Sequence, residues 1–99
     1  MKKLIVAAAL SMLAMGAAHA ADEAAGKAKY ASCAGCHGQN GKSMSPAFPT
    51  LHGKDAAYIE AQLHAFKDGK RNNPMMSPQA KGLSDADMAN IAAFLAAQK

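Results

Sequence analysis

The sequence predicts an all-α protein with one small domain, and three observations lead to this fold class. Residues 55–69 and 84–95 carry apolar side chains three and four positions apart, the spacing of an amphipathic helix. No segment alternates apolar and polar residues with the two-residue period of a strand. The chain has 99 residues, too few for more than one ordinary domain. We therefore expect a compact fold of about four helices joined by loops.

The first 20 residues have the three parts of a secretory signal peptide. Two lysines supply the positive charge, residues 4–15 are apolar, and Ala-His-Ala at 18–20 fits the cleavage site. The apolar stretch is shorter than the ~20 residues that a membrane-spanning helix needs. We expect export to the periplasm with removal of residues 1–20, a single folded domain at 21–99, and no stable insertion in a membrane.

The first half of this domain is expected to hold a helix and a long loop. Asp22 and Glu23 favour the N-terminus of a helix, and the following segment is compatible with helix as far as Ser32. Residues 38–53 are rich in Gly, Ser, Asn and Pro, which predicts irregular structure.

Two further helices are expected in the second half. Asp55 can cap a helix that Gly69 is placed to end. Four of its residues share one face: Tyr58, Ile59, Leu63 and Phe66. After a loop that allows one helical turn at 78–81, Ser84 and Asp87 resemble a capping box. They precede a last helix with Phe94 beside an apolar stripe of Met88, Ile91, Ala92 and Leu95.

Charge and composition limit the possible partners and the core. Removal of the two signal-peptide lysines lowers the formal net charge from +4 by two, and no dense run of Lys or Arg remains. Nucleic acid is therefore not an expected partner. The chain has no Trp and many of its apolar residues are Ala, so little apolar area is available for burial. Domains this small often complete their core with disulfides, a metal or another group.

Cys33 and Cys36 are the only cysteines, and His37 follows them directly. A disulfide between them would close a very small loop and would restrain the unfolded chain little. A dithiol oxidoreductase is expected with a strand–helix–strand pattern, which the sequence lacks. A structural zinc site needs four ligands, and the adjacent Cys36 and His37 are poorly disposed to share a tetrahedral site.

Covalent haem attachment accounts for all three residues. Two thiols add across the two vinyl groups of a porphyrin, and two intervening residues let both sulfurs reach one edge of the ring. His37 can then bind the iron through an imidazole nitrogen, and C-x-x-C-H is the signature of c-type attachment. The haem would also supply a large apolar plate to the core, worth several kcal/mol at ~25 cal/mol per Å² buried.

The far side of the iron has several candidate ligands: His52, His64, Met44, Met75, Met76 and Met88. Met88 belongs to the expected core. Met44 is close in sequence to the attachment site, so little chain would be available to wrap around the ring. Met75 and Met76 lie in a Pro-containing loop, with enough chain after His37 to cross to the other face. Either residue could serve. A thioether stabilises ferrous iron, so His/Met ligation would raise the reduction potential.

The chain resembles the class I c-type cytochromes, of the small soluble bacterial monohaem kind. The resemblance spans nearly all of residues 24–98 and rests on CAGCHG, FPTLHG, YIEAQLHAFKDGKR, NPMMSP and LSDADMANIAAFL. It implies a compact cytochrome c fold of helices around one covalently bound haem c, with one haem edge exposed.

The resemblance also implies roles for individual residues around the haem. Cys33 and Cys36 would hold the haem, and His37 would be the proximal ligand. Pro49 matches the family proline whose carbonyl accepts a hydrogen bond from the ligand imidazole. Leu51 would pack on the haem.

Further roles follow from the same resemblance in the second half of the chain. The family's Pro-x-Met spacing before the last helix selects Met76 as the distal ligand. Arg71 matches a basic residue that commonly meets a haem propionate. Gly26 and Tyr30 match the face of the first helix that meets the last helix.

The resemblance implies a one-electron carrier rather than an enzyme. If protein ligands fill both axial positions, no site remains for a substrate, and the iron can only cycle between ferric and ferrous. The expected partners are periplasmic or membrane-bound redox proteins in transient complexes, with interfaces below ~1,200 Å². Two alternatives remain: a haem electron-transfer subunit of a larger dehydrogenase, and a haem protein with a labile sixth ligand that binds small gases.

Overall fold

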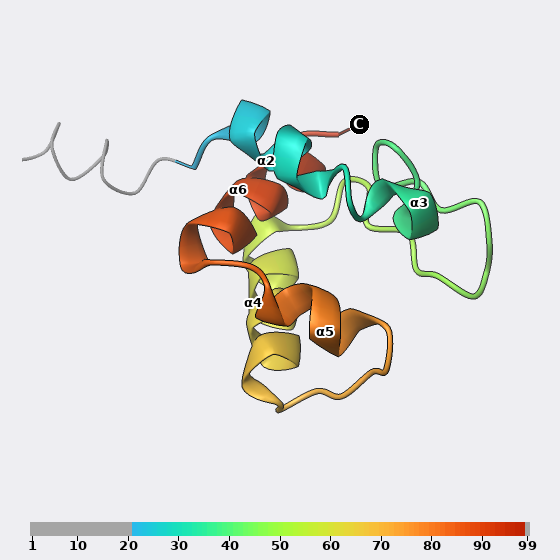
Figure 1. The fold of residues 1–99 in the computed structure, drawn as a ribbon. Coiled ribbons are helices and arrows are strands. Elements are labelled where there is room, and N and C mark those ends of the chain that lie inside the picture. Colours follow the sequence, from blue (N-terminus) through green and yellow to red (C-terminus); the bar gives the residue numbers. More distant parts are fainter. Residues whose placement is uncertain (1–20, 99) are drawn as a thin grey trace, which may run out of the picture.

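The computed structural model describes residues 21–98, which contain helices and loops but no strands (Figure 1). The expected all-α class is therefore confirmed, and the expected signal peptide lies outside the described residues. Within this range five helices follow one another: α2 (Glu23–Tyr30), α3 (Ala34–His37), α4 (Ala56–Asp68), α5 (Met76–Lys81) and α6 (Asp85–Ala96). None of these helices combines the length and the apolar content that crossing a bilayer requires.

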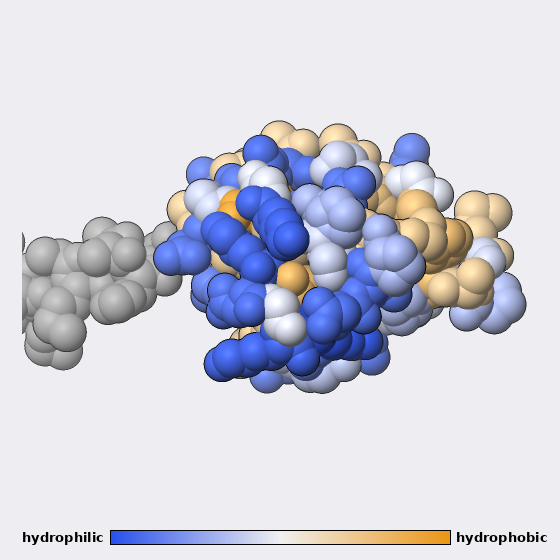
Figure 2. Space-filling view, turned by 60° about the horizontal axis from the view of Figure 1, so that its bottom comes forward, coloured by the Kyte–Doolittle hydropathy of each residue, from blue (hydrophilic) through white to orange (hydrophobic). Residues whose placement is uncertain are grey.

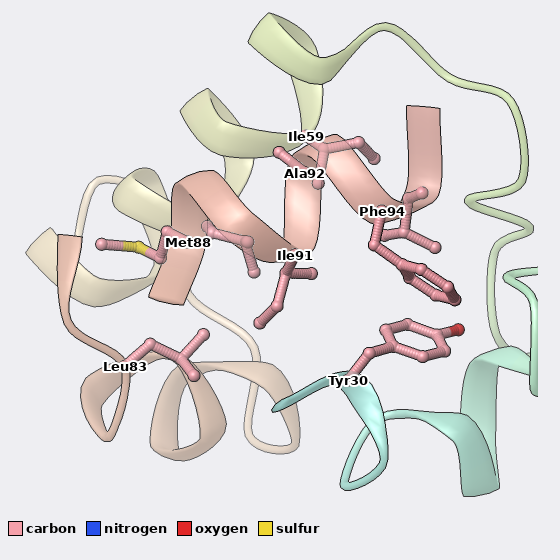
Figure 3. Close-up of a cluster of buried hydrophobic side chains, with 9 residues drawn as sticks. Tyr30, Ile59, Leu83, Met88, Ile91, Ala92 and Phe94 are labelled. Carbon is pink, nitrogen blue, oxygen red and sulfur yellow. The ribbon is translucent and has the colours of Figure 1, made fainter. Parts of the chain in front are cut away.

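Helix α6 lies at the centre of the core. Both α2 and α4 pack against it, and α5 packs against α4 (Figure 1). The buried cluster draws on α2, α4, α6 and the connection between α5 and α6, and comprises Tyr30, Ile59, Leu63, Leu83, Met88, Ile91, Ala92, Phe94 and Leu95 (Figure 3). The apolar stripe predicted for the last helix is confirmed, and Phe94 beside it is buried as well. Helix α6 is apolar on more than one side because α2 and α4 each pack against it.

The crossing of α2 and α6 depends on Gly26. A Cβ atom at this position would lie 1.9 Å from the carbonyl oxygen of Asn90, so only glycine permits this approach of the two backbones. One turn later, the rings of Tyr30 and Phe94 meet with their centroids 5.4 Å apart (Figure 3). The predicted contact of the first and last helices through Gly26 and Tyr30 is confirmed.

Most of the predicted helix ends are also confirmed. The side chain of Asp22 accepts a hydrogen bond from the backbone N–H of Ala25 at the start of α2. Ser84 and Asp87 form a complete capping box at the start of α6, with both reciprocal bonds at 3.0 Å. Gly69 ends α4 in the left-handed conformation at φ 81°.

Four local expectations differ from the structure in whole or in part. Asp55 occupies the N-cap position of α4, but its side chain makes no capping hydrogen bond. Residues 78–81 are helical, as the sequence allowed, but they belong to a longer helix that begins at Met76. The first helix ends at Tyr30 rather than Ser32, because the chain turns there into the short helix α3. Tyr58 is half exposed, because only the other three residues of its predicted face reach the core.

Candidate functional site

A cavity of about 300 Å³ opens between the cysteine segment and the start of α5. This volume lies at the lower end of the ~300–1,000 Å³ typical of ligand pockets. Every residue that the sequence predicted to hold haem or iron lines this one cavity: Cys33, Cys36, His37, Pro49, Leu51, Arg71 and Met76. The fold thus gathers residues from α3, the following loop, the segment after α4 and α5 around a common space.

The two cysteines occupy one helical turn at the entrance to α3. The backbone N–H groups of Cys36 and His37 both donate to the carbonyl of Cys33, at 3.2 Å and 3.0 Å. Residues three apart in such a turn lie on the same side, which suits attachment of both sulfurs to one edge of a porphyrin. The thiols are not joined in a disulfide; Cys33 is partly buried and Cys36 is exposed.

The alternative uses of these cysteines find no support in the structure. Burial raises the pKa of the Cys33 thiol, whereas the reactive cysteine of a dithiol oxidoreductase has a lowered pKa. Among residues 21–98, no group of three or more His, Cys, Asp or Glu side chains is arranged to hold a metal ion. A structural zinc site of the usual four ligands is therefore not present in this part of the chain.

His37 is buried, and its ring orientation is set from a distant part of the loop. Its Nδ1 atom lies 2.8 Å from the carbonyl oxygen of Pro49. A carbonyl can only accept, so Nδ1 carries the proton and Nε2 keeps its lone pair for a metal. The ring of Phe48 meets the imidazole edge-on, with centroids 6.3 Å apart. The hydroxyl of Tyr30 donates to the carbonyl of Gly38 at 2.7 Å, which ties the backbone beside His37 to α2.

The loop from α3 to α4 is closed by Gly41. Its carbonyl accepts hydrogen bonds from the backbone N–H groups of Leu51 and His52, at 2.7 Å and 3.0 Å. Gly41 has φ 86°, and a Cβ atom there would come within 2.8 Å of the His52 nitrogen and of a Leu95 methyl group. Glycine is required on both counts. This closure brings Pro49 and Leu51 back to the cavity.

Both adjacent methionines also line the cavity. Met76 is half-buried and packs against the core, whereas Met75 is 54% exposed. The other predicted candidates lie elsewhere. Met44 is 96% exposed and Met88 is fully buried in the core. His52 and His64 do not line the cavity.

Asn73 is a residue near these methionines that the sequence analysis missed. Its side-chain oxygen accepts hydrogen bonds from the backbone N–H groups of Met75 and Met76, at 2.8 Å and 3.0 Å. Asn73 also lines the cavity. The signal was present in the sequence, because Asn two or three residues before a helix is a common capping and turn residue.

Two cations stand at the rim of the cavity. The guanidinium of Arg71 lies 4.6 Å from the centroid of the Phe66 ring and donates to the side-chain oxygen of Gln62. The ammonium of Lys54 lies 5.9 Å from the centroid of the Tyr58 ring. All five of these residues line the cavity, so its rim is positively charged and suited to carboxylates.

This donor set fits haem c. The turn at Cys33 presents two thiols, His37 keeps one free ring nitrogen, and the thioether of Met76 lines the same cavity. Between them the lining includes large apolar side chains: Leu51, Ile59, Leu63 and Phe66. A flat apolar group with carboxylates at one edge would match both the lining and the basic rim.

Comparison with known proteins agrees with this chemistry. The cytochrome c family model matches residues 23–99. The chain belongs to the cytochrome c family. Haem c is therefore its cofactor, attached through Cys33 and Cys36 in the C-x-x-C-H spacing.

Relatives of this family member are named as cytochromes and as an electron acceptor. Cytochrome c-554(548) of Halomonas halodenitrificans is 43% identical over 61 residues, which cover 59% of this chain and 74% of the relative. A thiosulfate dehydrogenase electron acceptor of Stutzerimonas stutzeri is 50% identical over 50 residues, covering 50% of this chain and 23% of the relative. These names support electron carrying as the general role.

The solved structures support the same fold. Reduced cytochrome c4 from Pseudomonas stutzeri superimposes with a TM-score of 0.76 at 37% identity, covering 81% of this chain and 47% of that one. This member of the family thus spans about half the length of cytochrome c4. The prediction of a small c-type cytochrome with a helical fold is confirmed.

Proposed function

We propose that this chain is a one-electron carrier of the bacterial periplasm, in which His37 and Met76 ligate the iron of a single haem c. One observation carries the proposal. An oriented histidine, with its free nitrogen available to a metal, and a half-buried methionine line the same cavity as the two attachment cysteines. His/Met ligation is typical of electron-transfer haems of this kind.

His37 is suited to be the proximal ligand. The hydrogen bond from Nδ1 to the Pro49 carbonyl orients the imidazole and increases the basicity of Nε2. The edge of Phe48 limits rotation of the ring. A firmly held ring keeps the same ligand geometry in both oxidation states, which suits rapid electron transfer.

Met76 is favoured over Met75 by its burial. Met76 packs against the core, so little rearrangement would be needed to hold its sulfur inside the cavity. Met75 is 54% exposed and would have to bury its side chain first. A thioether ligand favours ferrous iron and raises the reduction potential.

When bound, haem c supplies an iron that cycles between the ferric and ferrous states and so carries one electron. If His37 and Met76 both hold the iron, no position on it would be left for a substrate, so we propose a carrier rather than an enzyme. Leu51 would pack on the ring and help to exclude water. Arg71, together with Lys54, would pair with the propionates.

The partners are proposed to be periplasmic or membrane-bound redox proteins. The name of the thiosulfate dehydrogenase electron acceptor favours a dehydrogenase as one electron donor. Figure 2 shows apolar side chains gathered at the edge where α3 and the following loop lie in Figure 1, while much of the facing surface is hydrophilic. A small apolar contact within a polar surface suits a complex that forms and separates quickly.

The chain organisation is part of the same proposal. Residues 1–20 would direct export and be removed, and residues 21–99 would form the single haem domain. The family match begins at residue 23, just after the proposed cleavage site, and supports this division. Mass spectrometry of the protein from a host that attaches haem would test it: the expected mass is that of residues 21–99 plus one haem.

The ligand is tested by replacing each methionine separately. The ferric protein should show the weak far-red absorption band of methionine-bound haem. Met76→Ala should abolish this band and let the reduced protein bind carbon monoxide, whereas the matched control Met75→Ala should change neither. Loss of the band only in Met75→Ala would reassign the ligand. A protein whose mass equals that of the bare polypeptide would overturn the haem proposal.

A second candidate function is an electron-transfer subunit of a larger dehydrogenase. It is favoured by a match to part of the solved thiosulfate dehydrogenase of Marichromatium purpuratum, with a TM-score of 0.64 at 35% identity, covering 68% of this chain and 14% of that one. The sizes of the native complexes separate the two candidates. A free carrier should elute in size-exclusion chromatography of a periplasmic extract at the size of one small domain. A subunit should elute with dehydrogenase activity in a much larger complex.

A further inference from the structure

We propose that Asn73 is a positioning residue that keeps Met76 in place as the distal ligand by fixing the backbone of residues 73–78. This inference rests on the proposed ligation by Met76. Asn73 would act through the methionine and would not itself bind iron.

The segment is held by four hydrogen bonds within itself. The side-chain oxygen of Asn73 accepts from the backbone N–H of Met75 at 2.8 Å and from that of Met76 at 3.0 Å. In return, the backbone N–H of Asn73 donates to the hydroxyl of Ser77 at 3.0 Å. The backbone N–H of Ser77 donates to the carbonyl of Asn73 at 2.9 Å. The Asn73 side chain therefore holds the backbone N–H groups of both methionines.

The prolines complete this arrangement. Pro74 and Pro78 have no backbone N–H to satisfy, and the ring of each restricts φ. Every backbone N–H in residues 73–78 is thus either absent or bonded within the segment. No bond from another helix is needed to shape this turn, and the carboxamide of Asn73 supplies two of its four hydrogen bonds.

Asn73 also replaces a cap that α5 lacks. Met75 occupies the N-cap position and has no side-chain capping bond. With only six residues, α5 has little helical stability of its own, so the bonds at its first turn matter. Successive residues of a helical turn point about 100° apart. Fixing the N–H groups of Met75 and Met76 therefore determines which side chain is exposed and which is half-buried against the core.

The contribution of Asn73 should show in the strength of the methionine–iron bond. Loss of a helix cap changes an equilibrium constant by about two- to thirtyfold. Because Asn73 and Met75 are exposed, water can replace the lost bonds, and the rest of the domain should remain folded. We expect Asn73→Ala to raise the fraction of protein with the methionine detached by about tenfold.

The test uses the holoprotein and two optical readouts. Carbon monoxide binds reduced haem only when the methionine has left, so its association rate reports the detached fraction. The pH at which the ferric far-red band disappears reports the same equilibrium in the other oxidation state. Asn73→Ala should speed carbon monoxide association about tenfold and lower that pH by about one unit. Asn73→Gln, with its oxygen one methylene out of place, should act in the same direction.

Two further variants separate positioning from general stabilisation. Asn73→Asp keeps an acceptor oxygen at the same place, so this variant should bind carbon monoxide at close to the rate of the unaltered protein. Asn72→Ala is the matched control, because Asn72 is the same residue type in the same loop and bonds only to the Gly69 carbonyl, at 3.4 Å. It should leave both readouts unchanged.

The outcomes distinguish a failure of this inference from a failure of the proposed ligation by Met76, on which it rests. If the unaltered ferric protein lacks the far-red band, methionine ligation fails, and the role of Asn73 fails with it. If that band is present but Asn73→Ala and Asn73→Gln bind carbon monoxide at the original rate, the role of Asn73 alone is overturned. The same holds if Asn72→Ala accelerates binding as much as Asn73→Ala does.

Discussion

The crossing of α2 and α6 provides a stability prediction whose size can be worked out from the structure. In Gly26→Ala the new Cβ atom would lie 1.9 Å from the Asn90 carbonyl oxygen and 2.5 Å from its carbon. Real Cβ contacts almost never fall below 3.0 Å, so the two helices would have to separate by roughly 1 Å. Because the obstructing atoms are backbone atoms, no side-chain rotation can relieve the clash.

Separation of the helices sets the cost of this substitution. Overpacking a core costs about 1–3 kcal/mol, and a clash with backbone belongs in the upper half of that range. The higher helix propensity of alanine offsets about 1 kcal/mol of this cost. The expected net loss of unfolding free energy is about 1–2 kcal/mol, which lowers Tm by about 4–16 °C in a domain of this size.

Thermal unfolding of the holoprotein, followed by far-ultraviolet circular dichroism, is the assay. Gly82→Ala is the matched control, since Gly82 has φ −81° and a Cβ atom there would meet its nearest neighbour at an ordinary 3.7 Å. Its Tm should change by no more than about 2–4 °C. A Gly26→Ala protein as stable as the original would refute the reasoning, because the backbones could then not be in the contact described.

Two other substitutions probe hydrogen bonds near the site and at α6. Tyr30→Phe removes the bond to the Gly38 carbonyl and should lower the unfolding free energy by about 1 kcal/mol at neutral pH. Burial raises the pKa of Tyr30 from 10.0 to about 12, so its contribution is complete below pH 10 and is lost as the pH rises toward 12. The backbone N–H of Ser84 holds the pKa of the Asp87 carboxyl below its ordinary 3.8. That contribution is present at neutral pH and is lost progressively as the pH falls below 3.8, so Asp87→Asn should lower Tm at pH 7 by an amount that shrinks below pH 3.8.

Both predictions are checked by Tm measured across pH for each variant beside the unaltered protein. For Tyr30, the gap between the two proteins should shrink above pH 10; a gap that stays constant would show that the phenol is not shielded from water. For Asp87, a difference in Tm that does not shrink as the pH falls below 3.8 would show that the carboxylate charge does not contribute to the capping box.

Several parts of the fold were predictable because they depend on neighbouring residues alone. The capping box of Ser84 and Asp87 lies within one helical turn, and the end of α4 depends on the freedom of Gly69. Asp55 shows the limit of such reasoning, because the residue stands at the N-cap without making the bond. Tyr58 shows a second limit. The spacing of apolar residues predicts which face of a helix is apolar, but not how far along that face the neighbouring helices cover it.

The sequence by itself determined the cofactor chemistry, because two thiols and an imidazole within five residues need no distant partner to define covalent haem attachment. It also determined the helical class, through the spacing of apolar residues. Only the tertiary structure decided how the site is held. The Pro49 carbonyl reaches His37 from 12 residues away, and packing against the core leaves Met76 half-buried while Met75 stays exposed. Two adjacent methionines are chemically the same, and burial by distant side chains is what makes them different.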